Sequence, residues 1–186
     1  MLLRRVALLS CVLSALVLSG CGGGHGRNDR DLIIDNYRML ADAIQQKNIR
    51  ALMALVSLDY LHDGVNRDGF RAIFEDYFDR HINIEARFSI RSIEFDRIDH
   101  ERLAYVSFDS AVAGDLLDAN GLVVRRETDV SEDSFMVWIL EDGYWRMLGN
   151  QKEAGELSIT PGKRSIGSLL GSKTRDVGLR RRGLSK

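Results

Sequence analysis

Cysteine is almost absent from this chain. Both cysteines, Cys11 and Cys21, fall within the first 21 of its 186 residues. The rest of the chain therefore has no disulfide framework, no thiolate metal site and no cysteine nucleophile. Two other patterns are missing: no His/Asp/Glu spacing indicates a metal site, and no glycine-rich loop follows a predicted strand to hold a phosphate. We expect neither a metal nor a cofactor.

The sequence also lacks an apolar run long enough to span a bilayer. Residues 6–18 are apolar apart from Ser10 and Ser14, but a transmembrane helix needs about 20 such residues. The run follows Arg4 and Arg5. A short basic region followed by an apolar region of this length is the anatomy of a secretory signal.

The apolar run ends in Leu18, Ser19, Gly20 and Cys21, which resembles the lipobox of bacterial lipoproteins. The resemblance implies that residues 1–20 are a signal peptide and that Cys21 receives a lipid that anchors the chain to a membrane. An ordinary secretory signal with a chance cysteine is the alternative. In lipoproteins an Asp after the cysteine favours the inner membrane. Gly22 stands there in this chain, so we expect a bacterial envelope protein at the periplasmic face of the outer membrane.

Charge is unevenly distributed along the chain. Residues 31–156 hold 14 Lys and Arg against 25 Asp and Glu, a net charge of −11, whereas residues 157–186 have a net charge of +7. We expect residues 21–30 to be a flexible tether, 31–152 to be the folded domain, and 153–186 to be a basic tail.

The tail has scattered glycines, and Ile166, Leu169 and Leu170 are too few to build a core, so we expect disorder there. Arg180, Arg181 and Arg182 resemble a nucleic-acid patch by composition alone. An exported protein meets little nucleic acid, and we expect none as a partner. Anionic lipid phosphates are better candidates, and a solvated tail that contacts its own acidic domain is the simpler alternative.

The folded domain begins with apolar residues at helical spacing and ends with alternating ones. Helices are predicted over 31–46, over 49–56 with Asn48 as N-cap, and from the N-cap Asp68 to about His81. From residue 82 the period is two, with a bulge predicted near Arg91 and a turn from Asp96 to Glu101. Further strands are expected over 102–114, 122–130, 135–140 and 144–150, with turns at Asn120-Gly121 and Asp142-Gly143. Helices followed by antiparallel strands indicate an α+β fold.

This element order resembles the NTF2-like (SnoaL-like) superfamily. The matching pieces are the closing hairpin at residues 141–148 and the segment at residues 59–64 before the third helix. The resemblance covers about residues 30–152 and implies a cone: three N-terminal helices packed on a curved antiparallel sheet around an interior pocket. The residues that we expect to line such a pocket are Tyr60, His62, Phe74, Tyr77, Phe88, Tyr105 and Trp138.

Enzymes of this superfamily transfer protons with pocket carboxylates, histidines and tyrosines. The resemblance suggests Asp59 as a base and Tyr37 as a donor to an oxyanion. Asp109, on a predicted central strand, is a further candidate carboxylate if its side chain faces the pocket. Each has a simpler interpretation. Tyr37 is a core tyrosine with a satisfied hydroxyl, Asp59 a turn residue, and Asp109 a solvent-facing residue of its strand.

Two other candidate groups have structural interpretations as well. We expect His62 and Asp63 to point to opposite faces of an extended segment, and His81 to interact with the end of the third helix. The arginine–carboxylate set of the epoxide hydrolases and the histidine pair of the dehydratases have no match here.

Three functions remain open at this point. The first is a non-catalytic, membrane-tethered domain that binds a small apolar ligand or a protein partner in the cell envelope. The second is a SnoaL-like isomerase, dehydratase or hydrolase that uses a pocket Asp with a Tyr donor. The third is a domain with a filled cone that forms a homodimer through its exposed sheet face.

Overall fold

The computed structural model describes residues 28–98 and 100–152. The predicted signal peptide, Cys21, most of the predicted tether and the whole of the predicted tail lie outside these residues. No helix in the described part is long and apolar enough to cross a membrane. The elements in chain order are α1 (Asp29–Gln45), α2 (Ile49–Ala54), β1 (Leu61–His62), β2 (Val65–Asn66), α3 (Arg67–Arg80), β3 (His81–Ile98), β4 (Glu101–Leu117), β5 (Val123–Glu141) and β6 (Tyr144–Met147).

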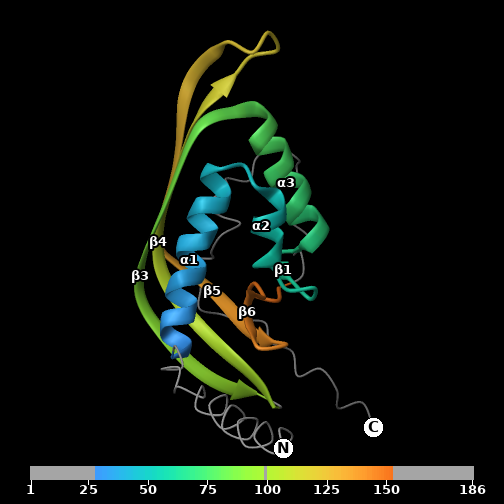
Figure 1. Cartoon of the computed structure of the whole chain (residues 1–186), viewed down its shortest axis with the longest axis vertical. Helices are drawn as coiled ribbons and strands as arrows, with labels where there is room; N and C mark the ends of the chain where they lie inside the picture. Colours follow the sequence, from blue (N-terminus) through green and yellow to red (C-terminus); the bar gives the residue numbers. More distant parts are fainter. Residues whose placement is uncertain (1–27, 99, 153–186) are drawn as a thin grey trace, which may run out of the picture.

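A four-stranded antiparallel sheet in the order β3-β4-β5-β6 forms one layer of the domain. The sheet is long and curved, and α1, α2 and α3 all lie on its concave side (Figure 1). The predicted α+β class, with three N-terminal helices packed on a curved antiparallel sheet, is confirmed.

Three asparagines cap the three helices. The side-chain oxygens of Asn28, Asn48 and Asn66 accept hydrogen bonds from backbone N–H groups three residues later, at 2.8, 3.0 and 2.9 Å. The prediction for Asn48 is confirmed. The prediction that Asp68 caps the third helix is wrong: β2 carries the chain to Asn66, so the helix begins earlier and Asp68 lies in its first turn.

Register shifts in the strands give the sheet its curvature. One lies between Ile90 and Ser92 on β3, as predicted. Another lies opposite the Phe108–Ser110 stretch of β4, where Asp133 on β5 has a φ of 55°. We expected a break between two strands at residues 131–133, but the chain forms a bulge there and continues as the single strand β5.

Each of the two predicted hairpin turns contains a glycine with positive φ. Gly121, at φ 78°, and the pair Asp142 and Gly143, at φ 51° and 83°, adopt the left-handed conformation that tight hairpins require. Both predicted hairpin turns are confirmed. The turn predicted at Asp96–Glu101 is shorter than expected, because β3 continues to Ile98 and pairs there with Glu101. The last strand is also shorter than predicted and ends at Met147.

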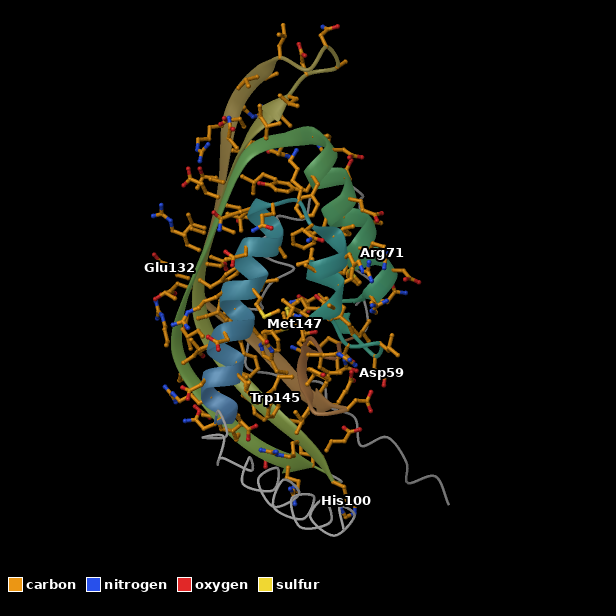
Figure 2. All side chains as sticks on the ribbon, viewed as in Figure 1. Asp59, Arg71, His100, Glu132, Trp145 and Met147 are labelled. Carbon is orange, nitrogen blue, oxygen red and sulfur yellow. The ribbon has the colours of Figure 1, made fainter. Side chains whose placement is uncertain are left out.

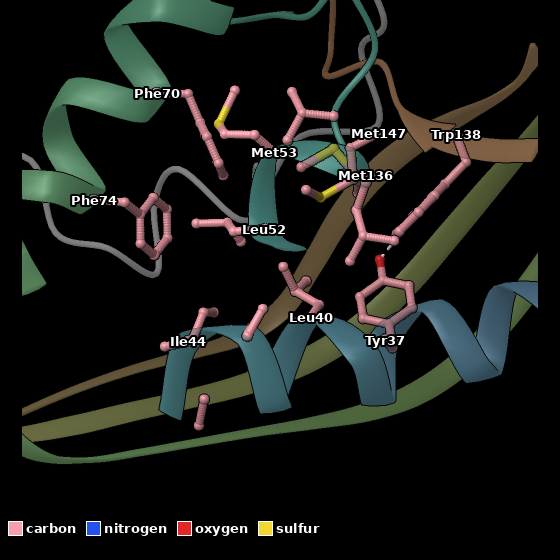
Figure 3. Packing of buried hydrophobic residues seen from close by; sticks show 14 of the residues in the cluster. Tyr37, Leu40, Ile44, Leu52, Met53, Phe70, Phe74, Met136, Trp138 and Met147 are labelled. Carbon is pink, nitrogen blue, oxygen red and sulfur yellow. Dashed lines mark hydrogen bonds between the residues drawn. The ribbon is translucent and has the colours of Figure 1, made fainter. Parts of the chain in front are cut away.

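The main core lies between the helices and the concave face of the sheet (Figure 3). Helix residues such as Ile44, Leu52 and Phe74 pack against strand residues such as Val106 and Trp138, and all five side chains are buried. Ala104, Val106, Phe108 and Val112 of β4 all belong to this core, as their alternation predicts.

The outer edge of β6 is covered by the segment after α2. The Met147 N–H donates to the Leu55 carbonyl at 2.7 Å, and the Ser57 N–H donates to the Met147 carbonyl at 2.9 Å. The chain then turns at Gly149, whose φ is 81°. A Cβ at that position would lie 2.3 Å from the Leu61 carbonyl oxygen, so this close approach requires glycine.

The first turn of α1 is attached to the sheet by polar contacts. The Trp145 indole N–H donates to Asp29 at 3.1 Å, and Arg102 forms an ion pair with the same carboxylate. These contacts hold the N-terminal end of the domain, where the predicted tether would enter it.

Candidate functional site

Tyr37 lies on the inner face of α1, buried against the concave face of the sheet. The Trp138 indole N–H donates to its hydroxyl at 3.2 Å (Figure 3). Its ring packs against Phe88, Phe108 and Trp138, with centroid distances of 5.6, 5.0 and 5.2 Å. Burial raises the Tyr37 pKa well above its ordinary value of 10.0. Tyr37 is therefore a neutral core tyrosine with a satisfied hydroxyl.

Asp109 lies on β4 and contacts charged residues of the neighbouring strands. Two nitrogens of the Arg91 guanidinium contact its carboxylate at 2.8 and 2.9 Å, and the Asp133 backbone N–H donates to it at 2.9 Å. The hydrogen bond from Arg91 holds the Asp109 pKa below its ordinary value. This is the opposite of the shift that suits a base working near neutral pH. Phe108, its neighbour on β4, belongs to the concave core, so Asp109 faces the convex side.

Asp59 lies in the loop between α2 and β1, with its side chain exposed (Figure 2). Its backbone is held in place: the N–H contacts the Ser57 hydroxyl at 3.1 Å, and the carbonyl accepts from the Gln151 amide at 3.0 Å. The structure therefore does not bring Tyr37, Asp59 and Asp109 together. One is in the core, one is in an exposed loop, and one is on the far face of the sheet.

Three of the predicted pocket residues, Tyr60, His62 and Phe74, belong to a row of rings formed by the inner face of α3, by β1 and by the residue that precedes β1. Tyr60 packs edge-on against Phe70 at 5.1 Å, and Phe70 contacts Phe74 at 4.7 Å. His62 stacks near Tyr60 at 6.4 Å. Tyr60, Phe70, Phe74 and His62 are exposed by no more than 2%, so they pack as core at this end of the cone.

His62 has a defined tautomer. Its Nδ1 accepts a hydrogen bond from the Asn150 backbone N–H at 3.2 Å, which leaves the proton on Nε2. The Nε2 atom lies 3.8 Å from the Asp63 carboxylate. The expectation that the two side chains diverge is wrong, because Asp63 has a φ of 47° and the segment is not extended at that residue. The Asp63 carboxylate also accepts from the Asn150 amide at 2.7 Å.

Tyr77 contributes to a polar cluster at the junction of α3 and β3. Its ring stacks on His81 at 4.0 Å. The His81 Nδ1 lies 3.0 Å from the Tyr77 carbonyl oxygen, and Nε2 lies 3.1 Å from the Glu127 carboxylate. The interaction of His81 with the end of the third helix was predicted. Its pairing with Glu127 was missed, because it depends on the register of β5, 46 residues away.

The remaining pocket candidates lie on two different faces of the sheet. Phe88 and Trp138 face the helices and pack around Tyr37. Tyr105 faces the other way and stacks on Phe135 at 5.9 Å, in a second apolar cluster on the convex side. Tyr105 therefore does not line the interior of the cone. Its strand parity, shared with Asp109, is the sequence signal that separates it from Val106.

Buried side chains occupy the middle of the domain, between the described helices and the concave face of the sheet. Residues from α1, α2, α3 and the concave face of the sheet meet there with almost no exposed surface. Close packing of this kind holds the aromatic residues in fixed positions and supports the fold.

No protein-family model matches the chain, and no curated protein matches it. Several solved structures are similar to it. A ketosteroid isomerase-like protein from Erwinia carotovora atroseptica has 16% identity over 66% of this chain and 93% of its own, with a TM-score of 0.48. An NTF2-like protein from Cytophaga hutchinsonii has 23% identity over 66% and 94%, with a TM-score of 0.44.

A hexachlorocyclohexane dehydrochlorinase has 12% identity over 64% of this chain and 80% of its own, with a TM-score of 0.46. These similarities concern the fold. The activities named for these proteins belong to them and are not transferred to this chain.

Proposed function

We propose that this chain is a membrane-anchored lipoprotein whose folded domain is non-catalytic and binds a protein partner in the bacterial cell envelope. The lipid anchor is supported by the order of basic region, apolar region and lipobox that ends at Cys21. The non-catalytic role is supported by one observation: Tyr37, Asp59 and Asp109 lie in three separate places.

A protein partner is favoured over a small apolar ligand because side chains occupy the interior. Tyr37, Phe74 and Trp138, which a ligand would have to displace, are each at most 3% exposed and already in contact with other rings. Opening a close-packed core to admit a ligand would forfeit those contacts.

The hairpin between β4 and β5 is the best candidate for the surface that a partner contacts. It extends beyond the helices at the upper end of the molecule (Figure 1). Leu122, Val123 and Val124 near its tip are more than half exposed, and Leu122 reaches 66%. Apolar side chains gathered on a projecting segment are typical of interaction sites.

The position of this hairpin suits a tethered protein. The first residues of α1 lie at the opposite end of the molecule from the hairpin tip (Figure 1). A lipid on Cys21 would place the α1 end nearest the membrane, and the hairpin would point away from it. A partner in the periplasm could then reach Leu122 and Val124 without meeting the bilayer.

The test is a photo-crosslinking residue placed at Val124 in cells that express the full chain. The matched control places it at Arg71, which is exposed on α3. We expect a discrete protein adduct from position 124, absent from position 71 and lost when Leu122 and Val123 are replaced by Ser. Equal adducts from both positions, or none from position 124, would contradict a partner site on the hairpin.

A further inference from the structure

The convex face of the sheet carries a second apolar cluster. Within residues 28–98 and 100–152, its buried members come from β4, β5 and the residue that follows β6, and none comes from a helix. They are Leu103, Phe135, Val137, Ile139 and Leu148, with Ile98 and Tyr105 packed against them. These residues are here called the convex cluster.

The strand that crosses the convex cluster is apolar on both faces. Phe135, Val137 and Ile139 face the convex side, while Met136 and Trp138 face the concave core. Antiparallel strands with one solvated face alternate apolar and polar residues, whereas a continuous apolar run indicates cover on both faces. The described helices α1, α2 and α3 cover only the concave side (Figure 1).

The convex cluster is nevertheless shielded from water. Val137 is 0% exposed and Leu103 is 1% exposed. Burial also raises the pKa of Tyr105, with a further contribution from Asp96. No described helix or strand lies over this face (Figure 1), and these exposures are those of the single chain, so the shielding has to come from other parts of the same chain.

We propose that the C-terminal segment of the same chain covers this face, with Ile166, Leu169 and Leu170 packed on the convex cluster. The chain leaves the described part at Lys152, only four residues after Leu148, a member of the cluster. The stretch from Lys152 to Ile166 spans up to about 46 Å at ~3.3 Å per residue, which is enough to cross the sheet.

The apolar residues of this segment are spaced to form one face. Ile166, Leu169 and Leu170 stand at i, i+3 and i+4, the spacing that groups side chains along one side of a helix. In solution alone these three residues could not build a core. On the convex cluster they would meet an apolar surface that is already formed.

The distribution of charge also favours contact between the C-terminal segment and the convex face. Residues 157–186 have a net charge of +7, and the domain is acidic. On the convex side, Glu94 and Asp96 are the β3 partners of Tyr105 and Leu103. Glu132 also lies on the side away from the helices (Figure 2). A basic segment on this face would lie close to Glu94 and Asp96 beside the convex cluster.

The first test is a crosslink within the full chain, with Cys11 and Cys21 replaced by Ser. Ser92→Cys on β3, opposite Ser107, is combined with Ser168→Cys and treated with a short bis-maleimide. The matched control combines Ser168→Cys with Ala72→Cys on the exposed side of α3. We expect an intrachain crosslink in the monomer from positions 92 and 168, and little from positions 72 and 168.

A second readout uses the rate at which tetranitromethane nitrates Tyr105, with the exposed Tyr144 of the same chain as reference. Leu169→Asp with Leu170→Asp should raise the Tyr105 rate towards that of Tyr144. Leu179→Asp with Leu184→Asp, in the same tail, should leave it low.

Two results would overturn the proposal. A crosslink that forms only between two chains would assign the face to a second copy. Equal crosslinking at positions 92 and 72, or a Tyr105 that stays protected after Leu169 and Leu170 are changed, would show that this segment is not the cover.

Discussion

The indole N–H of Trp138 donates a hydrogen bond to the hydroxyl of Tyr37 across 101 residues of sequence. This bond joins the first helix to a central strand in the middle of the core. Tyr37, which the sequence suggested as an oxyanion donor, is therefore the buried hydrogen-bond partner of the Trp138 indole.

Replacing Tyr37 by Phe should destabilise the domain by about 1–3 kcal/mol, because the Trp138 N–H would then be buried without an acceptor. Urea unfolding measures this cost. Combining Tyr37→Phe with Trp138→Phe removes both polar groups, so the two effects should not add. Tyr144→Phe, at an exposed tyrosine, is the control and should be nearly neutral. Additive effects of the two core substitutions would contradict the bond.

Gly149 and Gly143 form a matched pair for a test of the chain reversal after β6. Both have positive φ, but an added Cβ meets nothing within 4 Å at Gly143 and would lie 2.3 Å from the Leu61 carbonyl at Gly149. We expect Gly143→Ala to cost about 1 kcal/mol from backbone strain and Gly149→Ala to cost about 3 kcal/mol or more. Similar costs in urea unfolding would show that Gly149 is not in close contact with Leu61.

Glu127 should contribute to the pH dependence of stability. Hydrogen bonds from Arg125 and His81 hold its pKa below the ordinary value of 4.5. A carboxyl with a lowered folded-state pKa stabilises the fold above pH 4.5, and this stabilisation is lost as the pH falls through the lowered value.

The free energy of unfolding should therefore fall less steeply below pH 4.5 in Glu127→Gln than in the unsubstituted protein. Because this side chain is 39% exposed, the difference should stay below about 1 kcal/mol. Arg125→Gln removes the hydrogen bonds from Arg125 to Glu127, so it should also make the free energy of unfolding fall less steeply with acid, but by a smaller amount. Identical acid profiles for all three proteins, measured by urea unfolding at a series of pH values, would rule out the contribution.

Local patterns in the sequence were sufficient to predict most of the fold. The capped helix after Asn48, the bulge near Arg91 and the glycine turns each depend on residues close together in the chain. Two of the errors in element boundaries have the same origin. The N-cap at Asn66 depends on the β1–β2 pairing, and the continuity of β5 depends on the bulge that Asp133 forms against β4. Pairings between strands cannot be predicted from the pattern of apolar and polar residues within one segment.

The candidate site was harder to predict for a related reason. Strand parity separates the face of Tyr105 and Asp109 from that of Val106, so two of the candidates could be assigned to the convex side from sequence. Strand parity does not predict which residues, distant in the sequence, will contact Tyr105 and Asp109. The contacts of Asp109 with Arg91, of His81 with Glu127 and of Tyr37 with Trp138 are set by sheet register and helix packing.

We propose that a lipid on Cys21 delivers this domain to a membrane. The most direct test is mass spectrometry of the N-terminal peptide of the protein extracted from the membranes of a bacterium with a working lipoprotein pathway, with Cys21→Ala as the control. We expect a chain that begins at Cys21 and carries acyl groups, together with loss of membrane association in the variant. An intact N-terminus at Met1, or a chain that begins at Cys21 with an unmodified thiol, would contradict it.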